Sequence, residues 1–102
     1  MVADADHTVR WANMAFERVL GYEPESLVGR DILPLFHPDD LPRLAETIGR
    51  LSAVPGAAGT VDARIRAADG SWHQMETAGT NLLDDPAVRG FVVSMRDVTE
   101  RR

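Results

Sequence analysis

The segment His37-Pro38-Asp39-Asp40 places an imidazole and two carboxylates within four residues. Such groups bind divalent metals and transfer protons in general acid–base catalysis. A metal site needs more ligands, and no other histidine or cysteine stands at an obvious spacing. Aspartate is also a preferred helix N-cap, and a helical pattern follows directly. We therefore expect Asp39 and Asp40 to cap that helix, and we assign neither a metal site nor a catalytic residue.

The remaining polar residues give little support for catalysis. A small hydrolase or isomerase is the alternative class, but it rests only on scattered Ser, His and Asp residues, without a nucleophile elbow, a phosphate loop or an H-E-x-x-H motif. The chain has no cysteine, which excludes disulfides, thiolate metal sites and cysteine nucleophiles. We predict that the chain by itself is not an enzyme.

Length and composition predict one globular domain. The chain has 102 residues, of which 44% are hydrophobic and 26% charged. Its formal net charge of −5 disfavours a nucleic-acid partner. No apolar run approaches the ~20 residues of a membrane span, and no signal-peptide pattern follows Met1. All 11 basic residues are arginine, which we interpret as the codon bias of a bacterium. We expect a cytoplasmic location and no membrane contact by this segment.

The first half of the chain reads as one strand followed by short helices. We predict a strand over residues 7–12, a helix from Asn13 to Gly21, a helical turn from Pro24 to Gly29, and a brief turn or loop within 32–36. The strongest helical signal spans Asp39 to Ala53, where apolar residues recur every three or four positions: Leu41, Leu44, Ala45, Ile48 and Leu51.

From residue 59 the apolar period changes from helical to strand-like. Val61, Ala63 and Ile65 alternate with charged residues, and Asp69-Gly70 is a strong turn signal. Two more strands are predicted over residues 71–83 and 91–98. Trp72 has the wrong parity for the apolar face of its strand, so we expect either a bulge or an indole on the solvent side. Helices followed by an antiparallel meander define an α+β protein.

Four stretches of the chain together resemble a PAS domain, and the resemblance covers nearly the whole sequence. They are Trp11-Ala12-Asn13-Met14-Ala15-Phe16 with Leu20-Gly21-Tyr22; Leu27-Val28-Gly29-Arg30; Phe36-His37-Pro38-Asp39-Asp40; and Arg64 to Gly70 leading to Trp72. The closing Arg96-Asp97-Val98-Thr99-Glu100-Arg101 is similar to the family's terminal signature.

The resemblance implies a five-stranded antiparallel sheet with short helices and one longer helix packed on one face. Its first strand should be central, yet only Met1-Val2-Ala3 are present to form it, so we expect a fragment of a longer protein. Residues 1–99 would form a single PAS-like domain, and residues 100–102 would begin a signalling-helix connector. The family often has Asp-Gly in the first turn, where this chain has Asp6-His7.

The resemblance also implies a function. PAS domains serve as input or dimerisation modules in sensor histidine kinases, cyclic-dinucleotide enzymes such as diguanylate cyclases, and transcription regulators. We therefore expect a non-catalytic module of a two-component system or similar pathway. It would sense a stimulus or small ligand, form a homodimer and act on an effector domain of the same chain. The alternative is a ligand-free protein-interaction or dimerisation module.

A candidate ligand pocket lies between the sheet and the helices. Apolar positions at these periods usually form plain core, which is the interpretation that we favour, and a ligand site is the alternative because Thr77, Gly79 and Ser94 add small or polar points to an apolar lining. No cofactor is required by the sequence. The resemblance implies that haem is disfavoured, because the family's haem-binding members place a histidine on the long helix and this chain has none there. It likewise disfavours cysteinyl flavin, because the family's light-sensing members use a cysteine that this chain lacks, while a non-covalent flavin or a small metabolite stays open. The candidate lining is Phe16, Leu20, Leu35, Leu44, Ile48, Ile65, Met75, Thr77, Val93 and Met95.

Asp97 and Thr99 are the residues that we expect to carry the output signal. Asp97 stands where the last strand ends, and Thr99 could cap a following helix. The resemblance makes Asp97 a hydrogen-bond clamp, although an ordinary solvent-facing acid fits the sequence equally well. We also expect Arg64 to pair with a carboxylate of the sheet such as Glu76.

Overall fold

The computed structural model describes residues 1–99, apart from the side chains of residues 15–17. The connector expected at residues 100–102 lies outside the described residues. In chain order the elements are β1 (Val2–Ala3), β2 (Val9–Trp11), α1 (Ala15–Leu20), α2 (Pro24–Leu27), η1 (Leu33–Leu35), η2 (Pro38–Asp40), α3 (Leu41–Ser52), β3 (Ala58–Arg66), β4 (Trp72–Leu82) and β5 (Gly90–Asp97), where η denotes a 3-10 helix.

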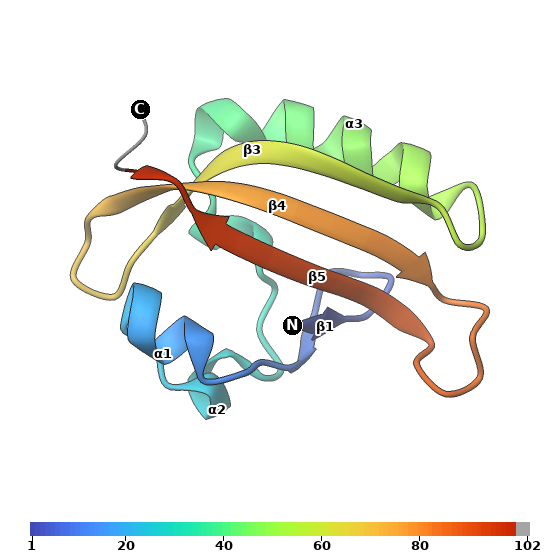
Figure 1. Cartoon of the computed structure of the whole chain (residues 1–102), viewed down its shortest axis with the longest axis horizontal. Coiled ribbons are helices and arrows are strands. Elements are labelled where there is room, and N and C mark those ends of the chain that lie inside the picture. Colours follow the sequence, from blue (N-terminus) through green and yellow to red (C-terminus); the bar gives the residue numbers. More distant parts are fainter. Residues whose placement is uncertain (100–102) are drawn as a thin grey trace.

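The strands form one five-stranded sheet in the order β2-β1-β5-β4-β3. Every neighbouring pair is antiparallel, and β1 lies inside the sheet as the resemblance implied. Figure 1 shows α3 running along the sheet beside β3 and β4, while α1 and α2 lie together at another part of the molecule. The predicted α+β architecture with one longer helix is confirmed.

The register of the meander determines which side chains meet the helices. Val61 on β3 stands opposite Thr77 on β4, and Thr77 stands opposite Met95 on β5. Because side chains alternate along a strand, these three residues share one face of the sheet. Trp72 has the opposite parity and is 41% exposed, with the Arg66 guanidinium 5.9 Å from its ring. The indole therefore lies on the solvent side, without a bulge between β3 and β4.

The edge strand β2 differs from the prediction. Val9 is 1% exposed and packs in the core, but Trp11, two residues later, is 55% exposed. The alternation predicted that both would be buried on one face. β2 is only three residues long and lies at the edge of the sheet. Its first residue, Val9, therefore packs in the core, whereas the indole of its last residue, Trp11, stays exposed.

The turn between β1 and β2 uses a left-handed backbone at His7, whose φ is 70°. Histidine adopts this region more readily than most other non-glycine residues, but still at a cost. The His7 N–H donates to the Asp4 carbonyl, and the His7 carbonyl accepts from the Ile32 N–H. The turn expected at Asp6-His7 therefore forms without glycine.

The N-terminus of α3 is organised differently from the expectation. The side chain of His37 accepts from the Asp39 N–H at 3.1 Å, and so histidine caps the 3-10 helix η2. The Asp40 carboxylate makes no capping hydrogen bond with its own helix. It accepts hydrogen bonds from Arg64 on β3, and the predicted pair of Arg64 with Glu76 is wrong. Glu76 accepts from Arg96 instead, at 2.9 Å.

Candidate ligand cavity and output end

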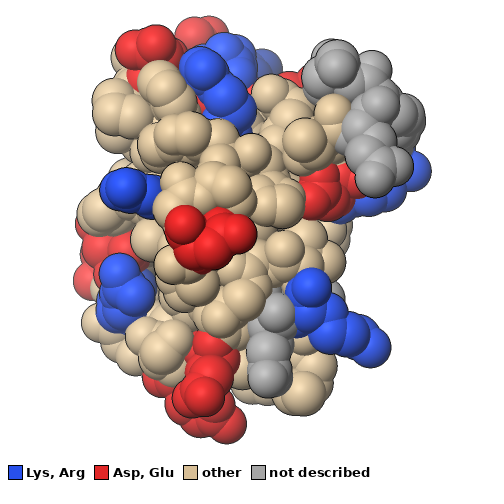
Figure 2. All heavy atoms as spheres, turned by 90° about the vertical axis from the view of Figure 1, so that its left-hand side faces the viewer, with Lys and Arg blue, Asp and Glu red and all other residues tan. Residues whose placement is uncertain are grey.

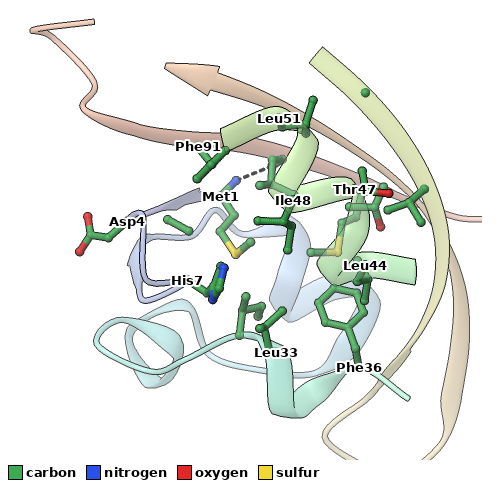
Figure 3. A pocket seen from close by; sticks show the side chains of 18 residues that line it. Met1, Asp4, His7, Leu33, Phe36, Leu44, Thr47, Ile48, Leu51 and Phe91 are labelled. Atoms are coloured by element: carbon green, nitrogen blue, oxygen red, sulfur yellow. Dashed lines mark hydrogen bonds between the residues drawn. The ribbon is translucent and has the colours of Figure 1, made fainter. Parts of the chain in front are cut away.

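A cavity of about 80 Å³ lies between α3, the sheet and the N-terminal segment. Figure 3 shows Leu44, Thr47, Ile48 and Leu51 of α3 on one side and Met1, His7 and Leu33 on the other. Its wall is almost wholly apolar. The full lining is Met1, Ala3, Asp4, His7, Ile32, Leu33, Phe36, Leu44, Thr47, Ile48, Leu51, Gly59, Val61, Thr77, Gly79, Phe91, Val93 and Met95.

Thr77 gives this apolar wall one unpaired polar atom. The residue is 7% exposed, and among the described residues its Oγ1 is the buried side-chain oxygen that has no hydrogen-bond partner. The other threonine of the wall, Thr47, donates from Oγ1 to the Arg43 carbonyl at 3.0 Å. A buried hydroxyl without a partner lowers the free energy of unfolding by about 1–3 kcal/mol, because in the unfolded chain the same hydroxyl is hydrogen-bonded to water. Thr77 Oγ1 is therefore the group on which a ligand could form a hydrogen bond.

Two glycines opposite each other on β3 and β4 shape the floor of the cavity. Gly59 pairs with Gly79, and both face Leu51 of α3. A Cβ at Gly59 would lie 3.3 Å from Leu51 Cδ2, and one at Gly79 would lie 3.6 Å from Leu51 Cδ1. The helix therefore packs close to the sheet at this point, and Leu51 occupies space that larger residues would otherwise fill.

The N-terminal segment closes another side of the cavity. The Met1 ammonium donates to the Val93 carbonyl at 2.9 Å, drawn as a dashed line in Figure 3, and burial lowers the pKa of this amine. In the same view the His7 ring points toward the Met1 side chain, and the Asp4 carboxylate points away. Asp4 forms an ion pair with Arg10 at 2.6 Å. His7 is thus the ionisable side chain that Figure 3 shows directed inward.

The structure places the ten predicted pocket residues in different surroundings. Five of them line the cavity: Leu44, Ile48, Thr77, Val93 and Met95. Leu35 and Ile65 belong to the buried core, and Leu20 and Met75 line a second hollow near α1. The side chain of Phe16 lies outside the described residues.

The periodicity that selected these ten residues identified the inner faces of the elements. It could not tell which part of that inner layer is filled. Near Leu35 and Ile65 the side chains pack against one another and fill the core. The cavity lies in the other part of this layer, next to β1. Packing between separate elements decides this difference.

Sequence reasoning missed the N-terminal part of the wall. Met1, Ala3 and His7 line the cavity because β1 is inserted between β2 and β5. Leu33 and Phe36 come from η1 and the residue after it. The expected central first strand was the available signal for Met1 and Ala3. Strand parity likewise pointed to Val61, and the helical stripe pointed to Leu51.

The second hollow, of about 320 Å³, lies between α1, β2 and β5. Its rim carries Trp11, Val19 and Val92, which are 55%, 40% and 38% exposed. Apolar side chains of this size, gathered around one hollow, are typical of a surface that contacts another molecule.

Asp97 and Thr99 form a hydrogen-bonded group where β5 ends. Asp97 Oδ1 accepts from the Thr99 N–H at 2.9 Å and from Thr99 Oγ1 at 2.5 Å. Thr99 Oγ1 accepts from the Gln74 N–H of β4 at 3.0 Å. The Thr99 hydroxyl is therefore engaged with β4, and the helix that it was expected to cap lies outside the described residues. Despite a partly buried carboxyl, the hydrogen bonds from Thr99 and His73 lower the pKa of Asp97.

Sequence reasoning also missed His73, which joins Asp97 to Ser71. His73 Nδ1 lies 2.6 Å from Asp97 Oδ2, and its Nε2 lies 3.3 Å from Ser71 Oγ. The order resembles a Ser-His-Asp triad. Ser71 Oγ, however, donates its proton to Asp69 Oδ1 at 2.6 Å, and none of these side chains lines either hollow. A nucleophile needs its proton directed at the base and a cleft for the substrate, so this array does not support a hydrolase.

Among the side chains that the structure describes, no group of three or more His, Asp or Glu residues could hold a metal ion. No helix of the described part of the chain is long and apolar enough to cross a membrane. On the face drawn in Figure 2, acidic and basic side chains are interspersed, and several of opposite sign lie side by side.

Comparison with known proteins assigns the family. A family model described as the PAS fold matches residues 9–95. A PAS domain from Colwellia psychrerythraea superimposes with a TM-score of 0.84 at 22% identity, covering 98% of this chain and 85% of that chain. The PAS-B domain of Cycle from Drosophila melanogaster, solved with bound ethylene glycol, gives 0.81 at 17% identity, covering 95% and 99%.

A third similar structure has higher identity. The LOV domain of a blue-light activated histidine kinase from Erythrobacter litoralis gives a TM-score of 0.75 at 27% identity, covering 96% of this chain and 93% of that domain. In a structure of the kinase itself, this chain spans 34% of the kinase. The chain belongs to the PAS family. PAS domains are generally sensory, regulatory modules, and they commonly dimerise within multidomain signalling proteins.

Proposed function

We propose that this chain is a cytoplasmic, non-catalytic sensory module of a larger bacterial signalling protein, which binds a small, mostly apolar molecule in the cavity beside α3. The observation that carries the proposal is the Thr77 hydroxyl, buried in an apolar wall without a partner. A ligand that carries one hydroxyl or carbonyl group would satisfy it. The volume of about 80 Å³ limits the ligand to a few heavy atoms, because an apolar cavity that is known to bind benzene is larger, at roughly 150 Å³.

The position of Thr77 supports a route from the cavity to the output end. Thr77 stands opposite Met95 on β5, and the next residue of that face, Asp97, holds Thr99. A ligand on Thr77 would change the packing of Met95, and β5 would carry that change to the end of the strand. An effector domain of the same chain would then respond, as in the histidine kinase to which this chain is similar. The effector here would be a histidine kinase or a diguanylate cyclase.

The test compares two probes in the chain and in Thr77→Val. 1-Propanol can form a hydrogen bond with Thr77, whereas xenon cannot, and both are titrated by NMR of the backbone amides. Loss of one hydrogen bond should weaken 1-propanol binding about three- to tenfold and leave xenon binding unchanged. Propanol should also shift the Thr99 amide signal in the parent chain.

Thr80→Val is the matched control, because Thr80 lies on the same strand but on the opposite face of the sheet. It should bind both probes like the parent. Equal propanol binding in the parent and in Thr77→Val, or binding without any change at Thr99, would contradict the proposed role of the cavity.

Dimerisation is the second function that we propose, and it does not need a ligand. The exposed apolar rim of the second hollow, formed by Trp11, Val19 and Val92, supports it. The occupant would be a second copy of this chain, since PAS domains commonly dimerise. Sedimentation equilibrium should show a dimer that Trp11→Ser weakens at least tenfold, whereas Trp72→Ser, on the other exposed indole, should not. A monomer at all concentrations would exclude this role.

A further inference from the structure

Six residues at the end of the sheet form one continuous series of hydrogen bonds. Asp69 lies in the β3–β4 turn, and Ser71 directly precedes β4. From these two residues the series continues through His73, Asp97 and Thr99 to the Gln74 N–H. It therefore connects the β3–β4 turn to the point where the chain leaves β5. The imidazole of His73 is the central member, and its side chain is 25% exposed.

Counting donors and acceptors identifies the protonation state that satisfies this series. The Ser71 hydroxyl has one proton and donates it to Asp69 Oδ1, so it can only accept from His73 Nε2. The Asp97 carboxylate likewise can only accept from Nδ1. Only an imidazolium donates from both nitrogens. In a neutral ring, one nitrogen would face an acceptor without a proton between them.

Two carboxylates, those of Asp69 and Asp97, belong to the hydrogen-bonded group around the ring. They come from the turn and from β5. On the neighbouring strand β3, the residue paired with His73 is the apolar Ile65. The nearby Arg66 guanidinium lies over the ring of Trp72. Because Trp72 and His73 are consecutive residues of β4, this guanidinium is on the face of the sheet opposite to the His73 ring.

We propose that His73 is a proton sensor that controls how firmly Thr99 is held at the end of β5. With an imidazolium, Asp97 is fixed between His73 and Thr99, and Thr99 is fixed to β4. Loss of the proton breaks one hydrogen bond of the ring and removes the ion pair with Asp97. The hold on Thr99 then weakens, so acid tightens and alkali loosens the exit of the chain toward its C-terminus.

Hydrogen exchange tests this proposal without a ligand or an effector domain. The observable is the protection factor of the Thr99 amide, which donates to Asp97, measured between pH 5 and pH 8 and corrected for intrinsic exchange. We expect it to fall at least about threefold over that range. In His73→Gln the protection factor should be constant with pH. A merely structural role for His73 would lower protection equally at every pH.

Two further variants separate the causes. His37→Gln, at a histidine that packs on Trp72 and caps η2, should keep the pH profile of the parent. Ser71→Ala frees Nε2 from facing an acceptor, so a neutral ring can satisfy Asp97 and the profile should become shallower. A constant protection factor in the parent, or an unchanged profile in His73→Gln, would overturn the proposal. Either result would leave the cavity function untouched.

Discussion

The carboxylate of Asp40 accepts three hydrogen bonds from Arg64, one from the main-chain N–H at 2.8 Å and two from the guanidinium at 3.1 and 3.0 Å. Asp40 is 4% exposed and precedes α3, whereas Arg64 lies on β3, the edge strand against which that helix packs. The pair therefore fixes the start of the long helix to the sheet edge. Because α3 forms one wall of the cavity, this contact also positions the candidate site.

The Asp40–Arg64 pair predicts a loss of stability in acid. The hydrogen bond from the Arg64 side chain lowers the pKa of Asp40 from 3.8 to about 2. Since this pKa is lower in the folded state, the stabilisation is complete above about pH 5 and is lost as the pH falls toward 2. Asp40→Asn should remove about 2 kcal/mol of unfolding free energy at pH 7, with a smaller difference at pH 2.5. Urea denaturation at several pH values measures it.

The control for this prediction is Asp39→Asn, because the Asp39 side chain is 79% exposed. Its stability should follow that of the parent within about 0.5 kcal/mol at every pH. A difference between Asp40→Asn and the parent that does not shrink in acid would contradict the ion-pair explanation.

Asn81 is expected to be intolerant of a charge. It is 2% exposed, and its Nδ2 donates to the carbonyls of Leu51 and Val54 near the C-terminal end of α3. Asn81→Asp removes both donors and places a negative charge at the negative end of the helix dipole. We expect a loss of about 2–4 kcal/mol, measured by chemical denaturation. Gln74→Glu, at the opposite parity on the same strand, should cost far less.

Gly90 is expected to tolerate no side chain. A Cβ there would lie 2.7 Å from the Ala3 carbonyl oxygen and would collide with the Arg10 guanidinium. Since a backbone oxygen in the sheet cannot move away easily, Gly90→Ala should cost about 1–3 kcal/mol. Gly49→Ala, inside α3 and with open space around it, should instead stabilise the chain by about 0.5–1 kcal/mol. Thermal denaturation compares them, and equal effects would argue against the close approach of β1 to β5.

The left-handed backbone of His7 predicts an inverted order of two variants. At φ 70° alanine pays the steric cost of this region and glycine does not, so His7→Ala should be less stable than His7→Gly by about 1 kcal/mol. At the exposed Val28, whose φ is −63°, the order should be the opposite: Val28→Ala should be more stable than Val28→Gly. Denaturant midpoints of the four variants test this, and the same order at both positions would exclude strain at His7.

Much of the fold could be predicted because its signals are local. Val61, Ala63 and Ile65 alternate with polar residues, and Asp69-Gly70 marks the turn to the next strand, where Gly70 has a φ of 91°. The apolar stripe of residues 41–51 likewise lies on the helix that it predicted. Each of these signals depends on neighbours a few residues away, where backbone geometry alone fixes which side chains share a face.

The partners of the charged groups could not be predicted in this way. Asp40 was assigned to helix capping because capping is a local preference. In the structure its carboxylate instead accepts hydrogen bonds from Arg64, which is 24 residues later in the chain. Arg64 was assigned to Glu76 because both lie on the sheet. Three well-aligned hydrogen bonds to a buried carboxylate outweigh one exposed ion pair, which contributes only about 0–1 kcal/mol.

The order of strands and helices and the resemblance to the PAS family follow from local sequence signals, since alternation, helical spacing and turn residues act over short stretches. Tertiary structure alone decided that the space lies beside Thr77, that Leu35 and Ile65 are solid core, and that His73 meets Asp97. These outcomes require β1 to enter the sheet between β2 and β5, and β4 to bring its first residues beside the end of β5. Whether a buried position is filled or empty depends on how separate elements pack, and not on any one of them.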